Sequence, residues 1–105
     1  MYNTVDELAK DGGKKIGKPG RHAGIRIVGS ESELEAIWIQ YSQGGTPVAG
    51  STYPGPRVDF GDGSEIAKRP SSKSGGPTID VVGAAGERVK IHVDPWPPAP
   101  TGAAP

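Results

Sequence analysis

A polar run from Lys68 to Asp80 contains the side chains of this chain that are most able to act on a phosphodiester. It holds three cations, four hydroxyl groups and one carboxylate within thirteen residues. The strand-like segment that follows places Arg88, Lys90 and His92 at alternate positions. Cations and hydroxyl groups hold phosphate oxygens, and an imidazole transfers protons near neutral pH. The two segments together indicate chemistry on phosphate esters.

Cleavage of RNA without a metal ion needs a base for the 2′-hydroxyl proton, an acid for the leaving oxygen and donors for the charge on phosphorus. His92 is the candidate acid or base, because the unperturbed pKa of histidine lies near neutrality. Arg69 can hold two phosphate oxygens through its planar guanidinium group. Further charges and hydroxyl donors would come from Ser71, Ser72, Lys73, Ser74, Thr78, Arg88 and Lys90.

Asp80, His22 and the Ser/Gly-rich loop each have two interpretations. Asp80 can orient the imidazole of His92, or it can pair with Lys90 across two strands. The second histidine, His22, lies in a basic loop and is either a surface residue or the partner in a two-histidine acid/base pair. The Ser/Gly-rich loop is either a plain connection or an anion site that uses the backbone amides of residues 75–76.

Four strand candidates must position these side chains, at residues 57–60, 64–69, 78–82 and 88–93. Asp-Gly within Gly61–Gly63 is a strong hairpin signal, and the last two strands are joined by a connection of hairpin length. Side chains alternate between the faces of a strand. If the four strands form an antiparallel meander, one face carries Glu65, Arg69, Thr78, Asp80, Arg88, Lys90 and His92.

Two helices are predicted ahead of these strands. Thr4 and Glu7 form a capping-box pattern before a helix at 5–11, and Ser30 and Glu33 form another before a helix that Gly44 and Gly45 should end. A short β-branched segment at 25–28 predicts one more strand. The predicted fold is α+β, with one or two N-terminal helices packed on a four-stranded antiparallel sheet.

The 105 residues allow one modest domain. We expect a lead-in with a short helix and a basic loop at 1–24, a ribonuclease-like domain at 25–94, and a Pro-rich tail at 95–105 in which Trp96 can dock. Net charge is zero, which argues against indiscriminate nucleic-acid binding. The five cations between Lys14 and Arg26 either give the molecule a binding polarity or form an ordinary basic loop.

Composition removes several classes of protein. The chain has no cysteine, so disulfides, thiolate catalysis and cysteine zinc sites are excluded. No apolar stretch is long enough to span a membrane, and we expect a soluble protein. The two histidines and the scattered acids lack the spacing of a metal site, and no phosphate-loop or dinucleotide glycine pattern occurs. We therefore expect neither a metal nor another cofactor.

The order of these features resembles that of the C-terminal toxin domains of bacterial polymorphic toxins. The resemblance covers roughly residues 25–93 and is most specific in the Ser-Ser-Lys-Ser-Gly-Gly-Pro-Thr-Ile-Asp run at 71–80. Several such toxins are similar in architecture to the barnase, EndoU, colicin and RelE superfold, in which RNA is cut on an open sheet face. The motif positions would then be Arg69, Ser72, Lys73, Thr78 and His92.

This resemblance implies an antibacterial ribonuclease that is released from a larger secreted toxin and acts in the cytoplasm of a target cell. Its partners would be RNA, such as tRNA, and a dedicated immunity protein, with the domain otherwise a monomer. Two alternatives remain open at this point. One is a non-catalytic protein-binding module of the immunity or adaptor type, and the other is a toxin that attacks a nucleotide cofactor.

Overall fold

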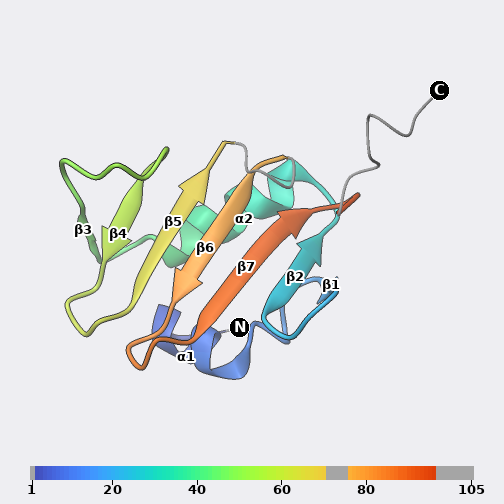
Figure 1. Ribbon diagram of the computed structural model, residues 1–105, viewed down its shortest axis with the longest axis horizontal. Coiled ribbons are helices and arrows are strands. Elements are labelled where there is room, and N and C mark those ends of the chain that lie inside the picture. The colour runs from blue at the N-terminus through green and yellow to red at the C-terminus, as the bar shows by residue number, and fades with distance from the viewer. Residues whose placement is uncertain (1, 71–75, 97–105) are drawn as a thin grey trace.

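The computed structural model describes residues 2–70 and 76–96 (Figure 1). Two helices, α1 (Val5–Asp11) and α2 (Glu31–Tyr41), pack against one mixed sheet. The strands are β1 (Lys18–Pro19), β2 (Ile25–Val28), β3 (Thr46–Pro47), β4 (Arg57–Asp59), β5 (Glu65–Arg69), β6 (Thr78–Val82) and β7 (Arg88–Val93).

The prediction of a four-stranded antiparallel sheet is wrong. The sheet has seven strands in the order β1-β2-β7-β6-β5-β4-β3, and β2 runs parallel to β7. Side-chain alternation cannot reveal this parallel pair, because Ile25 faces Lys90 from a distant part of the chain. The edge strands β1 and β3 have two residues each and contain Pro19 and Pro47. Such short proline-containing segments do not give a strand pattern, since proline cannot donate to the ladder.

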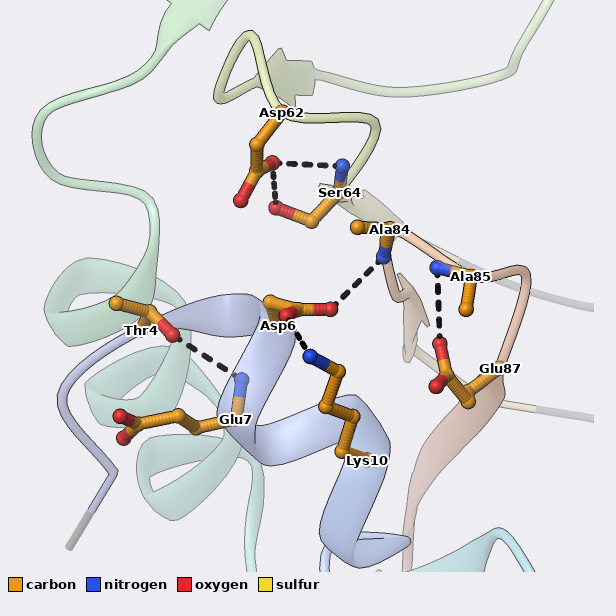
Figure 2. Close-up of polar contacts among 9 residues, drawn as sticks. All are labelled: Thr4, Asp6, Glu7, Lys10, Asp62, Ser64, Ala84, Ala85 and Glu87. Carbon is orange, nitrogen blue, oxygen red and sulfur yellow. Dashed lines mark hydrogen bonds and ion pairs between the residues drawn. The ribbon is translucent and has the colours of Figure 1, made fainter.

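Both helices begin where the capping patterns predict. Thr4 Oγ1 accepts a hydrogen bond from the Glu7 amide at 3.1 Å, as Figure 2 shows, and Ser30 Oγ accepts one from Glu33 at 3.2 Å. Helix α1 ends at Gly12, whose φ of 73° is left-handed and therefore favours glycine. Helix α2 ends at Tyr41, before the glycine pair that was expected to stop it.

The hydrophobic core lies between the helices and one face of the sheet. Leu8 of α1 and Leu34 of α2 pack there with Ile66, Ile79 and Ile91 from the three central strands. In Figure 1 both helices lie behind the sheet, and none of the described helices covers the face toward the viewer. The core also takes in Tyr2, Val5 and Ile16. Residues expected to form a lead-in are therefore packed into the same core as the sheet.

Polar contacts attach α1 to the turn between β6 and β7 (Figure 2). The carboxylate of Asp6 accepts a hydrogen bond from the Ala84 amide at 2.8 Å and pairs with Lys10 at 2.8 Å. The bond from Lys10 and then the one from Ala84 lower the pKa of Asp6. Glu87 accepts from the Ala85 amide within the same turn at 3.2 Å. These contacts fix the end of the sheet at which β7 begins.

One cation of the basic segment is a buried structural residue. Arg26 Nε donates to the Ile16 carbonyl at 2.7 Å, and Nη2 donates to the carbonyls of Lys14 and Gly17 at 3.2 and 3.1 Å. The side chain therefore holds the segment before β1 against β2. Because its donors are used internally and it is buried, Arg26 is not part of a binding surface.

Candidate functional site on the open face of the sheet

The strand register brings the predicted site residues of β5, β6 and β7 onto one face. Thr78 lies opposite both Arg69 and His92, and Asp80 lies opposite Lys90. Side chains directly opposite one another in a sheet point to the same face. Ile79 and Ile91, the alternate residues, belong to the core. The polar side chains therefore share the face opposite the helices, as the alternation predicts.

A cavity of about 310 Å³ lies on this face, and we call it the cationic pocket. Its floor includes Ala67 and Val82, at positions between the charged side chains. The polar residues that line it are Tyr53, Arg57, Glu65, Arg69, Asp80, Arg88 and Lys90. Four cations against two carboxylates leave the pocket positive, although the whole chain has no net charge. Such a pocket is suited to an anion.

Asp80 is the centre of the polar contacts in the pocket. Its carboxylate lies 3.0 Å from Arg69 Nε and 3.4 Å from Lys90 Nζ, and it accepts a hydrogen bond from the Tyr53 hydroxyl. Of the two interpretations of Asp80, the structure has the pairing with Lys90. Burial first, and the bond to Asp80 second, raise the pKa of Tyr53 far above its usual value. The phenol is therefore a protonated donor at neutral pH.

Tyr53 reaches the pocket from the connection between β3 and β4. A Cβ atom on Gly55 would lie 2.0 Å from the Lys68 carbonyl oxygen, so only glycine lets this connection run so close to β5. The Lys68 amide also donates to the Pro56 carbonyl at 3.1 Å. Tyr53 was not among the predicted site residues, because a turn-rich segment with three prolines has no periodicity that would place its side chains.

Arg57 enters the pocket beside Tyr53 and was not among the predicted site residues. Its Nη2 and Nε atoms lie 2.7 and 3.2 Å from Glu65 Oε2, and Nη1 donates to Ser51 Oγ at 3.1 Å. Arg88, in contrast, is exposed and forms no ion pair with any described residue. The side chain of Lys90 is 49% exposed. Arg88 and Lys90 are thus the cations most open to a ligand.

His92 lies on the predicted face but is only 2% exposed. The Trp96 ring stacks on the imidazole, with centroids 4.1 Å apart and planes inclined by 5°. Nδ1 lies 3.0 Å from Thr78 Oγ1. Burial, and then the charge of Lys90, lower the pKa of His92 from 6.5 to about 4. The imidazole is therefore neutral at physiological pH and is covered rather than open to solvent.

The remaining predicted residues do not join this group. His22 is exposed in the turn between β1 and β2, three residues before Ile25, which pairs with Lys90. It does not line the cationic pocket. Lys68, from the polar run, faces the helices and forms an ion pair with Glu35 of α2. Four predicted residues lie outside the described part of the chain: Ser71, Ser72, Lys73 and Ser74.

Within residues 2–70 and 76–96, no three His, Asp or Glu side chains are grouped so that they could bind a metal ion. Neither of the helices described has the length and apolar character needed to cross a membrane. Comparison of the chain with protein-family models, with curated proteins and with solved structures found no match in any of the three.

Proposed function

We propose that this chain is an antibacterial toxin domain that binds RNA on the open sheet face and cleaves a phosphodiester bond without a metal ion. The observation that carries the proposal is the cationic pocket, which is lined by Arg57, Arg69, Arg88 and Lys90 together with the carboxylates of Glu65 and Asp80. RNA presents one negative phosphate per nucleotide, and arginine and lysine are the residues that bind it.

Charge balance indicates which cations hold the phosphate. Arg57 is neutralised by Glu65, and Asp80 neutralises one of the two cations beside it. Arg88 is exposed and has no ion pair among the described residues, and together with Lys90 it supplies the excess positive charge. A phosphate that enters the pocket would replace Asp80 as the partner of Lys90, so it gains one cation without leaving another charge unpaired.

Two groups in the pocket can transfer protons in the proposed reaction. Asp80 can accept the proton of the 2′-hydroxyl as that oxygen attacks phosphorus, and the P–O5′ bond then breaks. The protonated Tyr53 hydroxyl can donate to the departing oxygen. His92 remains a proposed catalytic residue through its neutral imidazole. For the imidazole to reach the scissile phosphodiester, the Trp96 ring would have to move from the stack.

The biological setting follows from the sequence resemblance alone. We propose delivery as part of a larger secreted toxin, action in the cytoplasm of a target cell, and inhibition by an immunity protein. An immunity protein with an acidic surface would complement the cationic pocket.

A binding module that uses this face without catalysis is the second candidate, because every polar atom of Asp80 and Arg57 described above is already paired.

Incubation of the purified protein with tRNA and total RNA in EDTA tests the proposal. We expect cleavage in EDTA, and we expect Asp80→Asn to reduce its rate by at least a hundredfold while the fold is retained. RNA that is bound but stays intact would support the binding module. Toxicity on expression without any loss of RNA would instead support attack on a nucleotide cofactor.

Substitution of two lysines, one in the pocket and one outside it, distinguishes a phosphate contact at a defined site from the general effect of removing one positive charge. Lys90→Ala should weaken RNA binding and reduce the slope of log K against log salt by about 1, because one phosphate contact is lost. Lys14 is exposed, does not line the pocket and carries the same charge, so Lys14→Ala should leave the slope nearly unchanged. Equal effects of the two substitutions would contradict a phosphate site at Lys90.

A further inference from the structure

The chain reverses direction after β7 and brings Trp96 back onto the open face. The Asp94 amide donates to the Val28 carbonyl at 2.8 Å, and the Asp94 carboxylate lies 3.6 Å from Lys18 Nζ. These contacts with β2 and β1 hold the segment that leads to Trp96. The indole ring then stacks on His92 in a nearly parallel arrangement. The result is a pair of flat rings at the end of β7.

Each ring of this pair has a buried nitrogen without a hydrogen-bond partner among the described residues, Nε2 of His92 and Nε1 of Trp96. Buried polar atoms in proteins are nearly always paired, because a lost hydrogen bond to water is costly. An unpaired nitrogen on one ring is unusual, and two on stacked rings are more so. Because both atoms are buried, a bound molecule would pair with them only after a shift of the rings exposes them.

The two rings line a cavity of about 360 Å³, and the other lining residues are Glu31, Gly76, Pro77, Val93, Asp94 and Pro95. This volume is within the range of small-ligand sites, which combine apolar walls with a few placed polar groups. The walls here combine proline and aromatic rings with two acidic residues, Glu31 and Asp94, and the polar groups are their carboxylates and the unpaired ring nitrogens. The cavity is therefore suited to a flat molecule with hydrogen-bonding atoms at its edge.

The hydrogen bond at Nδ1 sets what the other imidazole nitrogen can do. If Thr78 Oγ1 donates to Nδ1, then Nε2 carries the proton and is a donor; if Nδ1 donates, then Nε2 is an acceptor. The indole Nε1 of Trp96 is always a donor. The indole nitrogen can thus bind an acceptor atom of a ligand, and the imidazole Nε2 can bind a second acceptor or a donor, depending on the tautomer.

The cavity and the cationic pocket are neighbours along β7. His92 lines the cavity, and Lys90, two residues earlier on the same face, lines the pocket. Two residues of a strand span about 7 Å. In the paired strand β6, Thr78 lies opposite His92 and Asp80 lies opposite Lys90. A single ligand with an anionic group and an aromatic group can therefore occupy both sites.

We propose that the cavity lined by His92 and Trp96 binds a nucleobase of the same RNA whose phosphate lies in the cationic pocket. This inference rests on the proposed function. A nucleobase is flat, stacks on aromatic and imidazole rings, and carries donors and acceptors along its edges. The assignment gives the two unpaired nitrogens partners, and it makes His92 a residue that contacts the substrate through its base.

Nucleosides, which have no phosphate, test the site separately from RNA cleavage. Trp38 and Trp96 are the only tryptophans, so Trp38→Phe leaves Trp96 as the sole indole fluorophore. In this variant we expect at least one of the four ribonucleosides to change the fluorescence emission of Trp96, and the change should saturate as the nucleoside concentration rises. Inorganic phosphate alone should not do so. Lys90→Ala should weaken binding of the corresponding nucleotide but not of the nucleoside.

His92→Phe keeps an aromatic ring for stacking but removes both nitrogens. It should weaken nucleoside binding about fivefold to tenfold, the effect of one hydrogen bond. Trp96→Phe, followed by calorimetry, should do the same, so the result does not depend on one variant that fails to fold. Nucleoside binding by a protein that leaves RNA intact would support the cavity while refuting cleavage. RNA cleavage without nucleoside binding, or with unchanged binding by both variants, would overturn the inference.

Discussion

The imidazole of His92 illustrates how neighbouring residues change the chemistry of a side chain. Its position in β7 predicts an exposed acid or base, and the strand register places it on the expected face. Trp96 then covers it, and burial lowers its pKa to about 4. The sequence could not show this cover, because the contact depends on the reversal of the chain at residues 94–95. Alternation along a strand gives the face on which a side chain lies, whereas its exposure depends on which other segments of the chain pack over that face.

A pH dependence of stability follows from this burial. The pKa of His92 is about 4 in the folded protein and 6.5 in the unfolded chain, so between these values the unfolded chain binds more protons. The contribution of His92 is fully favourable above pH 6.5 and is lost as the pH falls toward 4. Between pH 7 and pH 5 the free energy of unfolding should decrease by about 2 kcal/mol through this residue.

Urea unfolding at the two pH values measures the effect, and His92→Phe serves as the reference because other groups titrate as well. The difference between the protein and this variant isolates the imidazole. In Trp96→Ala the pKa of His92, followed by NMR, should rise toward 6.5 because its cover is removed. A pKa unchanged by this substitution would show that Trp96 does not cause the burial.

The elements follow local sequence signals closely, whereas their pairing does not. Capping residues located both helices, and β-branched segments located β2 and the strands from β4 to β7. The two-residue strands β1 and β3 gave no signal, and the predicted antiparallel meander left β2 out of the sheet. Tyr53 was missed because its place depends on the close approach of the β3–β4 connection to β5, whereas Arg57 lies in β4 opposite Ala67 of β5.

Arg26 connects the element β2 to the segment that precedes β1. Arg26→Ala should lower the free energy of unfolding by about 3 kcal/mol, because the three carbonyl oxygens that it binds lose their donor. Arg21→Ala, at an exposed position nearby in the sequence, should change it by no more than about 0.5 kcal/mol. Chemical denaturation of both variants makes the comparison. Similar losses would show that Arg26 acts only through its charge.

At the scale of the whole molecule, the sheet separates two kinds of surface. One face is covered by α1 and α2 and holds the apolar core, and the other carries the cationic pocket and the cavity next to it. The zero net charge hides this arrangement, because opposite charges are distributed over different regions. Composition therefore predicts a small soluble domain, but the local positive charge appears only when the strands are aligned.

The core predicts that the first 24 residues are required for folding. Val5, Leu8 and Ile16 are each no more than 4% exposed, and full burial of such side chains contributes about 1.5–3 kcal/mol apiece. Their summed loss is comparable with the whole stability of an ordinary domain. A chain that starts at Ile25 should therefore show no cooperative unfolding transition in urea.

Two single substitutions refine this test. Leu8→Ala should retain the fold but lose about 3 kcal/mol, whereas Lys10→Ala, on the exposed side of α1, should lose far less. A sharp unfolding transition in the chain that starts at Ile25 would mean that the sheet and α2 form a stable unit without α1.

The central position of β7 has a consequence for synthesis. This strand lies between β2 and β6, yet it is the last strand of the described chain to leave the ribosome. Until it emerges, no strand joins the β1–β2 pair to the antiparallel strands from β3 to β6, so the sheet cannot be completed while the polypeptide grows. Pairing of segments distant in sequence is also slow. The nascent chain should therefore remain sensitive to protease until β7 has been translated, and should gain the protection of the complete sheet only then.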